Sequence, residues 1–149
     1  MLVTIFFRIR ALIKAIPFMK PLLYPIYRFI GLLYSAQIPL QASFQDQPNF
    51  KHGLFGIFIA GGAKFGTNCT FFQQVTIGSV TDGGLRNGSP EVGDNCIFFA
   101  GCKVIGRVKI GNNCKIGPNV VVWEDIPDGT TIVHDRQAFR RLPSETKKI

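Results

Sequence analysis

The stretch VGDNCIFFAGCKVIGRVKIGNNCKIGPNVVV, residues 92–122, repeats with a period of six, and this repeat decides the fold. In most units a large apolar or β-branched residue stands first, a turn-forming residue fourth and a small or β-branched residue fifth. The first positions are Val92, Phe98, Val104, Ile110, Ile116 and Val122, and Ile59, Phe65, Phe71 and Ile77 keep the same spacing upstream. Asn and Gly at the fourth position tolerate the positive φ of tight corners. The pattern predicts short parallel strands stacked as a β-solenoid.

The chain length and charge limit the kinds of partner that are expected. The 149 residues suit one domain with a real core. The net charge of +8 would permit an acidic membrane or nucleic acid as partner. No basic run is interleaved with aromatic residues in the repeat, so no nucleic acid is expected.

The four cysteines all occupy the fifth, inward position of their units. They are Cys69, Cys96, Cys102 and Cys114. This placement favours reduced core thiols in a cytoplasmic protein over disulfides. No Cys-x-x-Cys or Cys/His spacing is present, so no metal site is expected.

Residues 1–45 differ in composition from the rest of the chain. They carry five basic residues among many apolar ones, and no acidic residue precedes Asp46. The basic residues interrupt the apolar run too often for a membrane-spanning helix, and no signal-peptide cleavage site is recognisable. Helices are expected at 5–16 and 22–36, limited by Pro17, Pro21 and Pro25. Two interpretations stay open: a segment lying on an anionic membrane surface, and an arm packed on the solenoid's open end or on a neighbouring subunit.

The predicted organisation has three parts. A basic, apolar helical arm spans 1–45, the repeat solenoid spans 46–133, and a tail spans 134–149. Within the solenoid, residues 79–91 lose the repeat and contain three glycines among other turn-forming residues, which predicts an extruded loop. Insertions at repeat corners usually map to the working face of a repeat protein.

Several motifs carry a resemblance to a known family. They are FGTNCT (65–70), VTIG (75–78), VGDN (92–95), IGNNCKIG (110–117) and VVVWEDIP (120–127). These resemble the hexapeptide-repeat acyltransferases, in the serine-acetyltransferase-like branch that includes O-acetyltransferases of bacterial surface polysaccharides. The resemblance covers about residues 50–133. It implies a left-handed parallel β-helix with three six-residue sides per coil, assembled as a homotrimer. The handedness comes from the resemblance alone, because it runs against the general rule for crossover connections.

Three sides per coil predict which repeat units stack. Units beginning at Phe65, Val92 and Ile110 should share one side, and units beginning at Phe71, Phe98 and Ile116 another. Cys69, Cys96 and Cys114 would then form one column, beside a column of Asn68, Asn95 and Asn113.

The resemblance implies transfer of an acetyl group from acetyl-CoA to a hydroxyl, and His52 is the expected general base. An imidazole has a pKa near the working pH, and this histidine precedes the repeat in a Gly-rich turn, as in the family. Lys51 stands where many members have an aspartate, and the spacing to Gly56 is one residue longer. His134 is interpreted as a surface residue. Ser89 stands where serine acetyltransferases have a second histidine.

The resemblance also implies a coenzyme A site along the β-helix. Small residues at Gly78, Ala100, Gly101 and Gly117 match positions that line the family's donor groove. Phe99 and Pro118 depart from the smaller family residues. Lys115 and Arg136 are candidates to bind the coenzyme phosphates, since charge-assisted hydrogen bonds would be the main polar gain. The reaction needs no metal.

The favoured function is an O-acetyltransferase whose small acceptor is a sugar or glycan precursor. The alternatives are a serine O-acetyltransferase and a non-catalytic β-helix scaffold. The expected location is the cytoplasm, with a peripheral contact of residues 1–45 at the inner membrane surface. Outward apolar residues Phe72, Phe99 and Val121 predict a subunit interface and a donor site shared between subunits.

Overall fold

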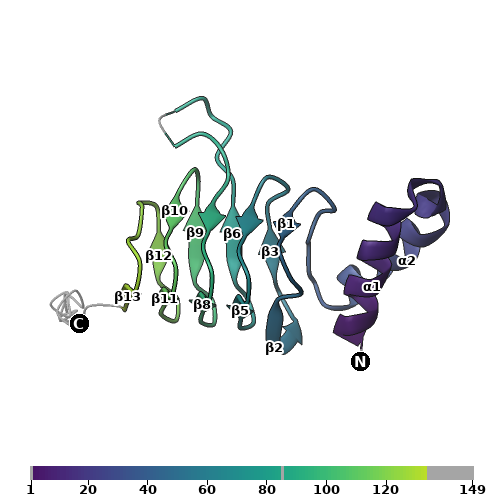
Figure 1. Cartoon of the computed structure of the whole chain (residues 1–149), viewed down its shortest axis with the longest axis horizontal. Coiled ribbons are helices and arrows are strands. Elements are labelled where there is room, and N and C mark those ends of the chain that lie inside the picture. Colours follow the sequence, from purple (N-terminus) through teal and green to yellow (C-terminus); the bar gives the residue numbers. More distant parts are fainter. Residues whose placement is uncertain (1, 85, 134–149) are drawn as a thin grey trace, which may run out of the picture.

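The computed structural model describes residues 2–84 and 86–133, which form a helical arm followed by a β-helix (Figure 1). The arm contains α1 (Leu2–Ala15), the short 3₁₀ helix η1 (Pro17–Met19) and α2 (Lys20–Leu33). The strands are β1 (Ser43–Phe44), β2 (Asn49–Leu54), β3 (Phe58–Ile59), β4 (Lys64–Phe65), β5 (Thr70–Phe71), β6 (Thr76–Gly78), β7 (Glu91–Val92), β8 (Ile97–Phe98), β9 (Lys103–Ile105), β10 (Lys109–Ile110), β11 (Lys115–Ile116), β12 (Val121–Val122) and β13 (Thr131–Ile132).

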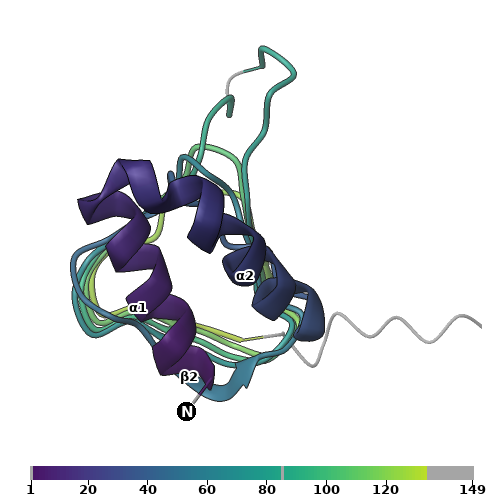
Figure 2. The same ribbon diagram turned by 90° about the vertical axis from the view of Figure 1, so that its right-hand side faces the viewer.

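The strands form three parallel sheets, one for each side of the coil. Their orders are β1-β4-β7-β10, β13-β11-β8-β5-β2 and β12-β9-β6-β3. Seen along its axis, the stack of coils has an open, three-sided outline (Figure 2). Both stacking predictions are confirmed, because Phe65 pairs with Val92 and Phe71 with Phe98 in register. The left-handed sense of the coils stays a prediction.

Residues with positive φ make the corners of the coils. Asn68, Asn95, Asn113 and Asn119 have φ between 53° and 59°, and Gly101 has φ 70°. Asn68 donates a side-chain hydrogen bond of 2.9 Å to Asn95, so the corner amides also bond along the axis. The sequence did not anticipate Gln74, which adopts φ 61°. Gly62 holds the same position in its unit but has no positive φ.

The interior of the β-helix is a set of stacked columns. Phe71 stacks on Phe98 with ring centroids 5.0 Å apart and on Phe50 at 5.4 Å. The four cysteine thiols are free and buried. Burial raises the pKa of Cys69 to about 11, and that of Cys96 and Cys102 to about 12. These thiols therefore act as small apolar core groups.

The arm closes one end of the β-helix. Helix α1 lies across the open mouth of the first coil, with α2 beside it (Figure 2). Phe6, Phe7 and Ile13 of α1 and Tyr27 and Ile30 of α2 belong to the same apolar core as the coils. The structure therefore shows that residues of the arm pack on the open end of the solenoid, while the contact with a membrane surface stays a prediction.

A buried arginine ties α1 to the first coil. The Arg10 guanidinium donates hydrogen bonds to the carbonyls of Leu40 and Ala42 and lies 5.0 Å above the Phe44 ring. Burial lowers the pKa of Arg10, an effect that Tyr27 partly opposes. The Tyr27 hydroxyl in turn donates to the carbonyl of Ile38. Polar bonds thus fix both helices to the segment that begins the coil.

The first coil starts within the segment that the sequence assigned to the arm. Helix α2 ends at Leu33, although it continues through Pro25. Gln37 already bridges to Phe58, and β1 pairs with β4. Residues 37–44 have no hexapeptide signature, yet the amides of Gln37 and Ser43 donate to the carbonyls of Ile57 and Ala63 in the neighbouring coil. Neither helix of the arm, nor any other helix within 2–84 and 86–133, is long and apolar enough to cross a membrane.

The loop between β6 and β7 projects from the three-sided prism that the stacked coils form (Figure 1). Val80 and Gly88 close its base with two backbone hydrogen bonds. The carbonyl of Arg86 accepts a hydrogen bond of 2.8 Å from the Arg107 amide, which anchors the loop to the neighbouring coil.

Candidate functional site

His52 lies on β2, in the coil that adjoins the arm, and its side chain is exposed. Phe50 pairs with Phe71, 21 positions later, whereas Phe58 pairs with Thr76, 18 positions later. The first coil therefore has three additional residues just after His52. Gly53 and Gly56 make this turn possible, with φ 71° and 65°.

The turn after His52 is anchored from the inside. Leu54 and Ile57 are both completely buried. Gly53 lies close to the Tyr34 ring, which makes an edge contact of 4.8 Å with Phe55. The histidine is therefore held on a backbone that is fixed both by the core and by the end of α2.

An aromatic ladder runs along the outer surface from the histidine. The His52 ring lies 5.5 Å from the Phe72 ring, and Phe72 stacks on Phe99 at 5.2 Å. Both phenylalanines are half-buried. In the described part of the chain no side chain forms a hydrogen bond with the imidazole, so Phe72 is what supports it.

Three of the predicted donor-site residues lie on the same corner as His52, further along the axis. The Gly101 amide donates to the carbonyl of Gln73, and the Asn119 amide donates to the carbonyl of Ala100, both at 3.0 Å. Gly117 ends the neighbouring strand β11. Because coils stack at about 4.8 Å, Gly101 lies roughly 10 Å along the axis from the histidine coil.

Gly101 has no room for a side chain. Its φ is 70°, and a Cβ at this position would meet the Asn119 side-chain oxygen at 2.1 Å. Gly101 and Gly117 are themselves buried, and the exposed residues at this corner are Pro118 and Asn119. The small residues therefore let the coils pack closely here.

The remaining predicted donor-site residues are distributed differently. Lys115 lies on β11, in the same sheet as His52, and its side chain is exposed. Gly78 ends β6 in another sheet, where a Cβ would meet Ile105 at 3.0 Å. One subunit therefore does not bring Gly78 to the histidine corner. Arg136 and His134 lie outside the described residues.

Sequence reasoning missed a cluster of cations at the base of the projecting loop. Arg86, Arg107 and Lys109 line a cavity of about 410 Å³ together with Asp125. Asp125 accepts a 2.9 Å hydrogen bond from the Lys109 amide and lies 3.7 Å from the Arg86 guanidinium. These residues come from the loop and two separate repeat units, so no local motif could have revealed them. The cluster can hold an anion.

A second residue that sequence reasoning missed is Gln73. Its register position is directly beside His52, two residues after the Phe50 and Phe71 pair. The side-chain oxygen of Gln73 is buried and accepts no hydrogen bond from the described residues.

Ser89 lies against Gly62, close enough that a Cβ on that glycine would meet its hydroxyl at 2.6 Å. It precedes the buried Pro90 at the foot of the loop. Within 2–84 and 86–133, no three His, Cys, Asp or Glu side chains are grouped as metal ligands would be.

Comparison with known proteins is consistent with this geometry. Residues 89–122 match the family described as bacterial transferase hexapeptide (six repeats). The chain is 40% identical over 83 residues to serine acetyltransferases of Staphylococcus aureus and Staphylococcus epidermidis. The match covers 55% of this chain but only 38% of those relatives' length.

Solved structures extend the likeness to the arm. The Neisseria gonorrhoeae serine acetyltransferase in complex with serine superposes with a TM-score of 0.74 at 25% identity, over 90% of this chain and 54% of that one. The soybean serine acetyltransferase apoenzyme gives a TM-score of 0.70 at 26% identity, over 86% and 51%. The predicted resemblance to hexapeptide-repeat acyltransferases of the serine-acetyltransferase-like branch is confirmed.

Proposed function

We propose that this chain is an acetyl-CoA-dependent O-acetyltransferase with His52 as its general base. The observation that carries the proposal is the position of His52. It is an exposed imidazole, held by a fixed turn, at one end of a corner lined by small residues. His52 lies in the first coil of a β-helix whose chain is similar to the serine acetyltransferases named above.

The proposed reaction needs one proton acceptor. The neutral His52 ring takes the proton of the acceptor hydroxyl while that oxygen attacks the thioester carbonyl. The bond between the carbonyl carbon and the coenzyme sulfur then breaks. The departing thiolate receives the proton from the imidazolium, which restores the base.

The donor would lie along the corner formed by Ala100, Gly101 and Gly117, with Lys115 beside it for a phosphate. Phe99 narrows this surface, because its ring stacks on Phe72 above the same column. Gly78 is on a different sheet from His52. We infer that a second subunit supplies that position, so that the donor site forms between neighbours in a homotrimer.

The proposal must also say which molecule carries the acceptor hydroxyl. The relatives are named serine acetyltransferases, so they favour serine, the alternative in the sequence analysis, over a sugar. A sugar remains the second candidate because the surface beside His52 is aromatic, through Phe72 and Phe99. The charged groups of serine would need a cation and an anion there, and Lys51 supplies only the cation.

The test is turnover of acetyl-CoA by the full chain with L-serine, free sugars, nucleotide sugars and glycan fragments. Coenzyme A release with at least one acceptor, abolished in His52→Ala, is the expected result. Efficient acetylation of serine alone would settle the acceptor as serine. Absence of coenzyme A binding in calorimetry, with no turnover of any acceptor, would contradict the enzyme proposal and favour the scaffold.

A further inference from the structure

The outer side of α2 is apolar although nothing in the structure covers it. Leu22, Ile26, Phe29 and Leu33 recur at spacings of four, three and four, which places them on one side of the helix. Tyr27 and Gly31 form the buried side of the helix and point away from these residues, whereas the buried Ile30 lies next to Ile26 at the edge. We define the docking face as these four residues together with Phe18 of η1 and Leu32. Phe18 is 82% exposed, Leu32 75% and Leu22 67%.

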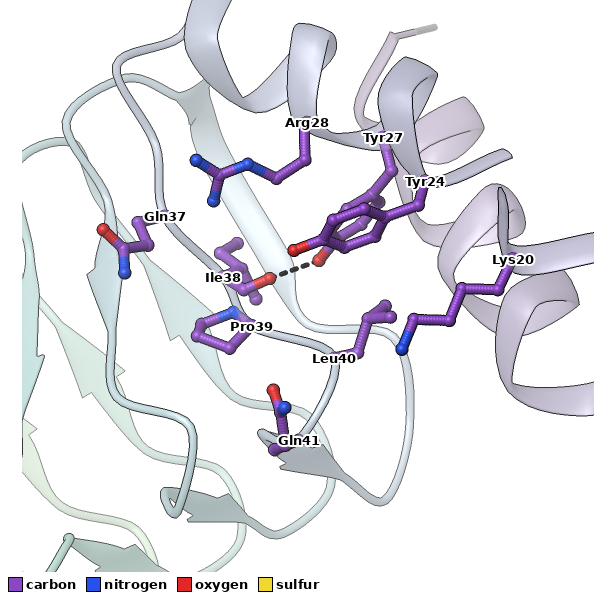
Figure 3. Close-up of a pocket in the computed structure, with 9 residues that line it drawn as sticks. All are labelled: Lys20, Tyr24, Tyr27, Arg28, Gln37, Ile38, Pro39, Leu40 and Gln41. Carbon is purple, nitrogen blue, oxygen red and sulfur yellow. Dashed lines mark hydrogen bonds between the residues drawn. The ribbon is translucent and has the colours of Figure 1, made fainter. Parts of the chain in front are cut away.

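A polar stripe runs along the flank of the same helix. Lys20, Tyr24 and Arg28 follow at intervals of four residues, between the buried side and the docking face. With the 37–41 segment they line a cavity of about 290 Å³, into which their side chains reach from α2 (Figure 3). The cavity thus offers two cations and a phenol hydroxyl next to an exposed apolar surface.

The charge on the arm has one sign. Arg8, Lys14, Lys20 and Arg28 are exposed, and residues 2–45 contain no aspartate or glutamate. A second copy docking through the same face would bring these cations against one another with no acid to neutralise them. An anionic lipid surface instead matches both features, since it accepts apolar side chains and attracts cations at the level of its phosphates.

We propose that the docking face binds the surface of an anionic phospholipid membrane, with Lys20 and Arg28 contacting headgroup phosphates. The helices lie on the membrane rather than across it, consistent with their 14-residue length. Because the arm caps the end of the prism, the coil that carries His52 is the one nearest the lipid, and β12 and β13 are the strands furthest from it (Figure 1).

Flotation of the full chain with vesicles tests the proposal. Binding is expected to vesicles of phosphatidylcholine with about a third phosphatidylglycerol, and to weaken strongly in high salt. The triple variant Leu22→Ser, Phe29→Ser, Leu32→Ser should lose about tenfold or more of the partitioning. Lys20→Gln with Arg28→Gln should lose about fivefold per residue. Trp123→Ser is the matched control, since Trp123 is 64% exposed near the other end, and it should bind as wild type does.

The single tryptophan makes the orientation measurable. Brominated lipids should leave the fluorescence of Trp123 unchanged in the wild-type chain. In a Trp123→Phe background, Phe29→Trp should be quenched on the same vesicles. These two readings use substitutions at exposed sites, so they do not depend on a destabilised variant.

Three results would overturn the proposal. Equal binding to vesicles with and without phosphatidylglycerol would remove the anionic recognition. Quenching of Trp123 but not of Phe29→Trp would mean that the other end of the prism contacts lipid. Failure to float, combined with oligomers that the triple variant dissociates in sedimentation, would mean that another copy or a protein surface covers the face.

Discussion

The arm and the β-helix are held together by different means. In the β-helix each coil rests on the next through backbone hydrogen bonds and stacked identical positions, as in the Phe50, Phe71 and Phe98 column. In the arm, contact with the coil depends on individual side chains such as Phe6 and Arg10. The comparison teaches that a repeat distributes its stability over many equivalent contacts, whereas a cap concentrates it in a few. The candidate base lies where the two regions meet.

The largest expected effect is on catalysis at this junction. His52→Ala should reduce turnover of acetyl-CoA with a working acceptor by roughly 10²–10⁴, because it removes the group that accepts the hydroxyl proton. Initial rates of coenzyme A release measure it, with circular dichroism as the check on folding. Near wild-type turnover would exclude His52 as the base. His134→Ala is the matched control and should leave turnover almost unchanged.

A pair of buried phenylalanines compares the two regions directly. Phe71→Ala, in the middle of a stacked column, should lower the free energy of unfolding by about 3–5 kcal/mol. Phe6→Ala empties a similar site where the ring stacks on Tyr27 at 4.2 Å, but it should mainly release the arm. Amide hydrogen exchange should then accelerate in α1 and α2 and stay slow in the coils. Equal loss of protection throughout would show that the arm and the β-helix unfold as one unit.

The polar attachment of the arm can be tested at Arg10. Arg10→Met keeps much of the apolar stem but leaves the carbonyls of Leu40 and Ala42 without their donor, which should cost about 1–3 kcal/mol. Urea titration measures the change. Arg8→Met is the control, because Arg8 is exposed and should change stability by less than about 0.5 kcal/mol. Similar effects of the two substitutions would refute the anchoring role of Arg10.

The buried thiols of the β-helix predict that the stability of the fold depends on pH. Burial raises the pKa of Cys69, Cys96 and Cys102, so folding favours their neutral form. Their contribution is complete below the ordinary thiol pKa and should be lost as the pH rises from about 9 toward 12. The urea midpoint should fall over this range, and less steeply in Cys102→Val. An unchanged slope in Cys102→Val would show that this thiol does not contribute.

The smallest effect concerns the donor phosphates. Lys115→Gln should raise the KM for acetyl-CoA by up to about tenfold with little change in kcat, since an exposed cation contributes to uniform binding. Arg107→Gln, at the loop cavity in the corner between β9 and β10, should have less effect. The reverse ranking would move the phosphate site to the cluster of Arg86, Arg107 and Lys109.

The sequence by itself determined the β-helix, its columns and the candidate base. In a solenoid with three sides per coil, neighbours along the axis lie 18 positions apart, as for Ile97 and Lys115, so counting residues predicts contacts. Even the loop between β6 and β7 only lengthens this interval, to 27 between Thr70 and Ile97. The asparagines at the corners could likewise be predicted, because their positive φ follows from the repeat.

Tertiary structure alone decided the features that do not follow from the six-residue repeat. The place of the arm depends on how Arg10 and Tyr27 meet residues 38–42, which share no repeat with them. Three features involve residues from different coils or sheets. They are the contact of Phe72 with His52, the position of Gly78 on another sheet than His52, and the cation cluster at the loop. The physical reason is that a periodic pattern fixes neighbours along the axis, while contacts across corners and ends depend on side-chain packing in three dimensions.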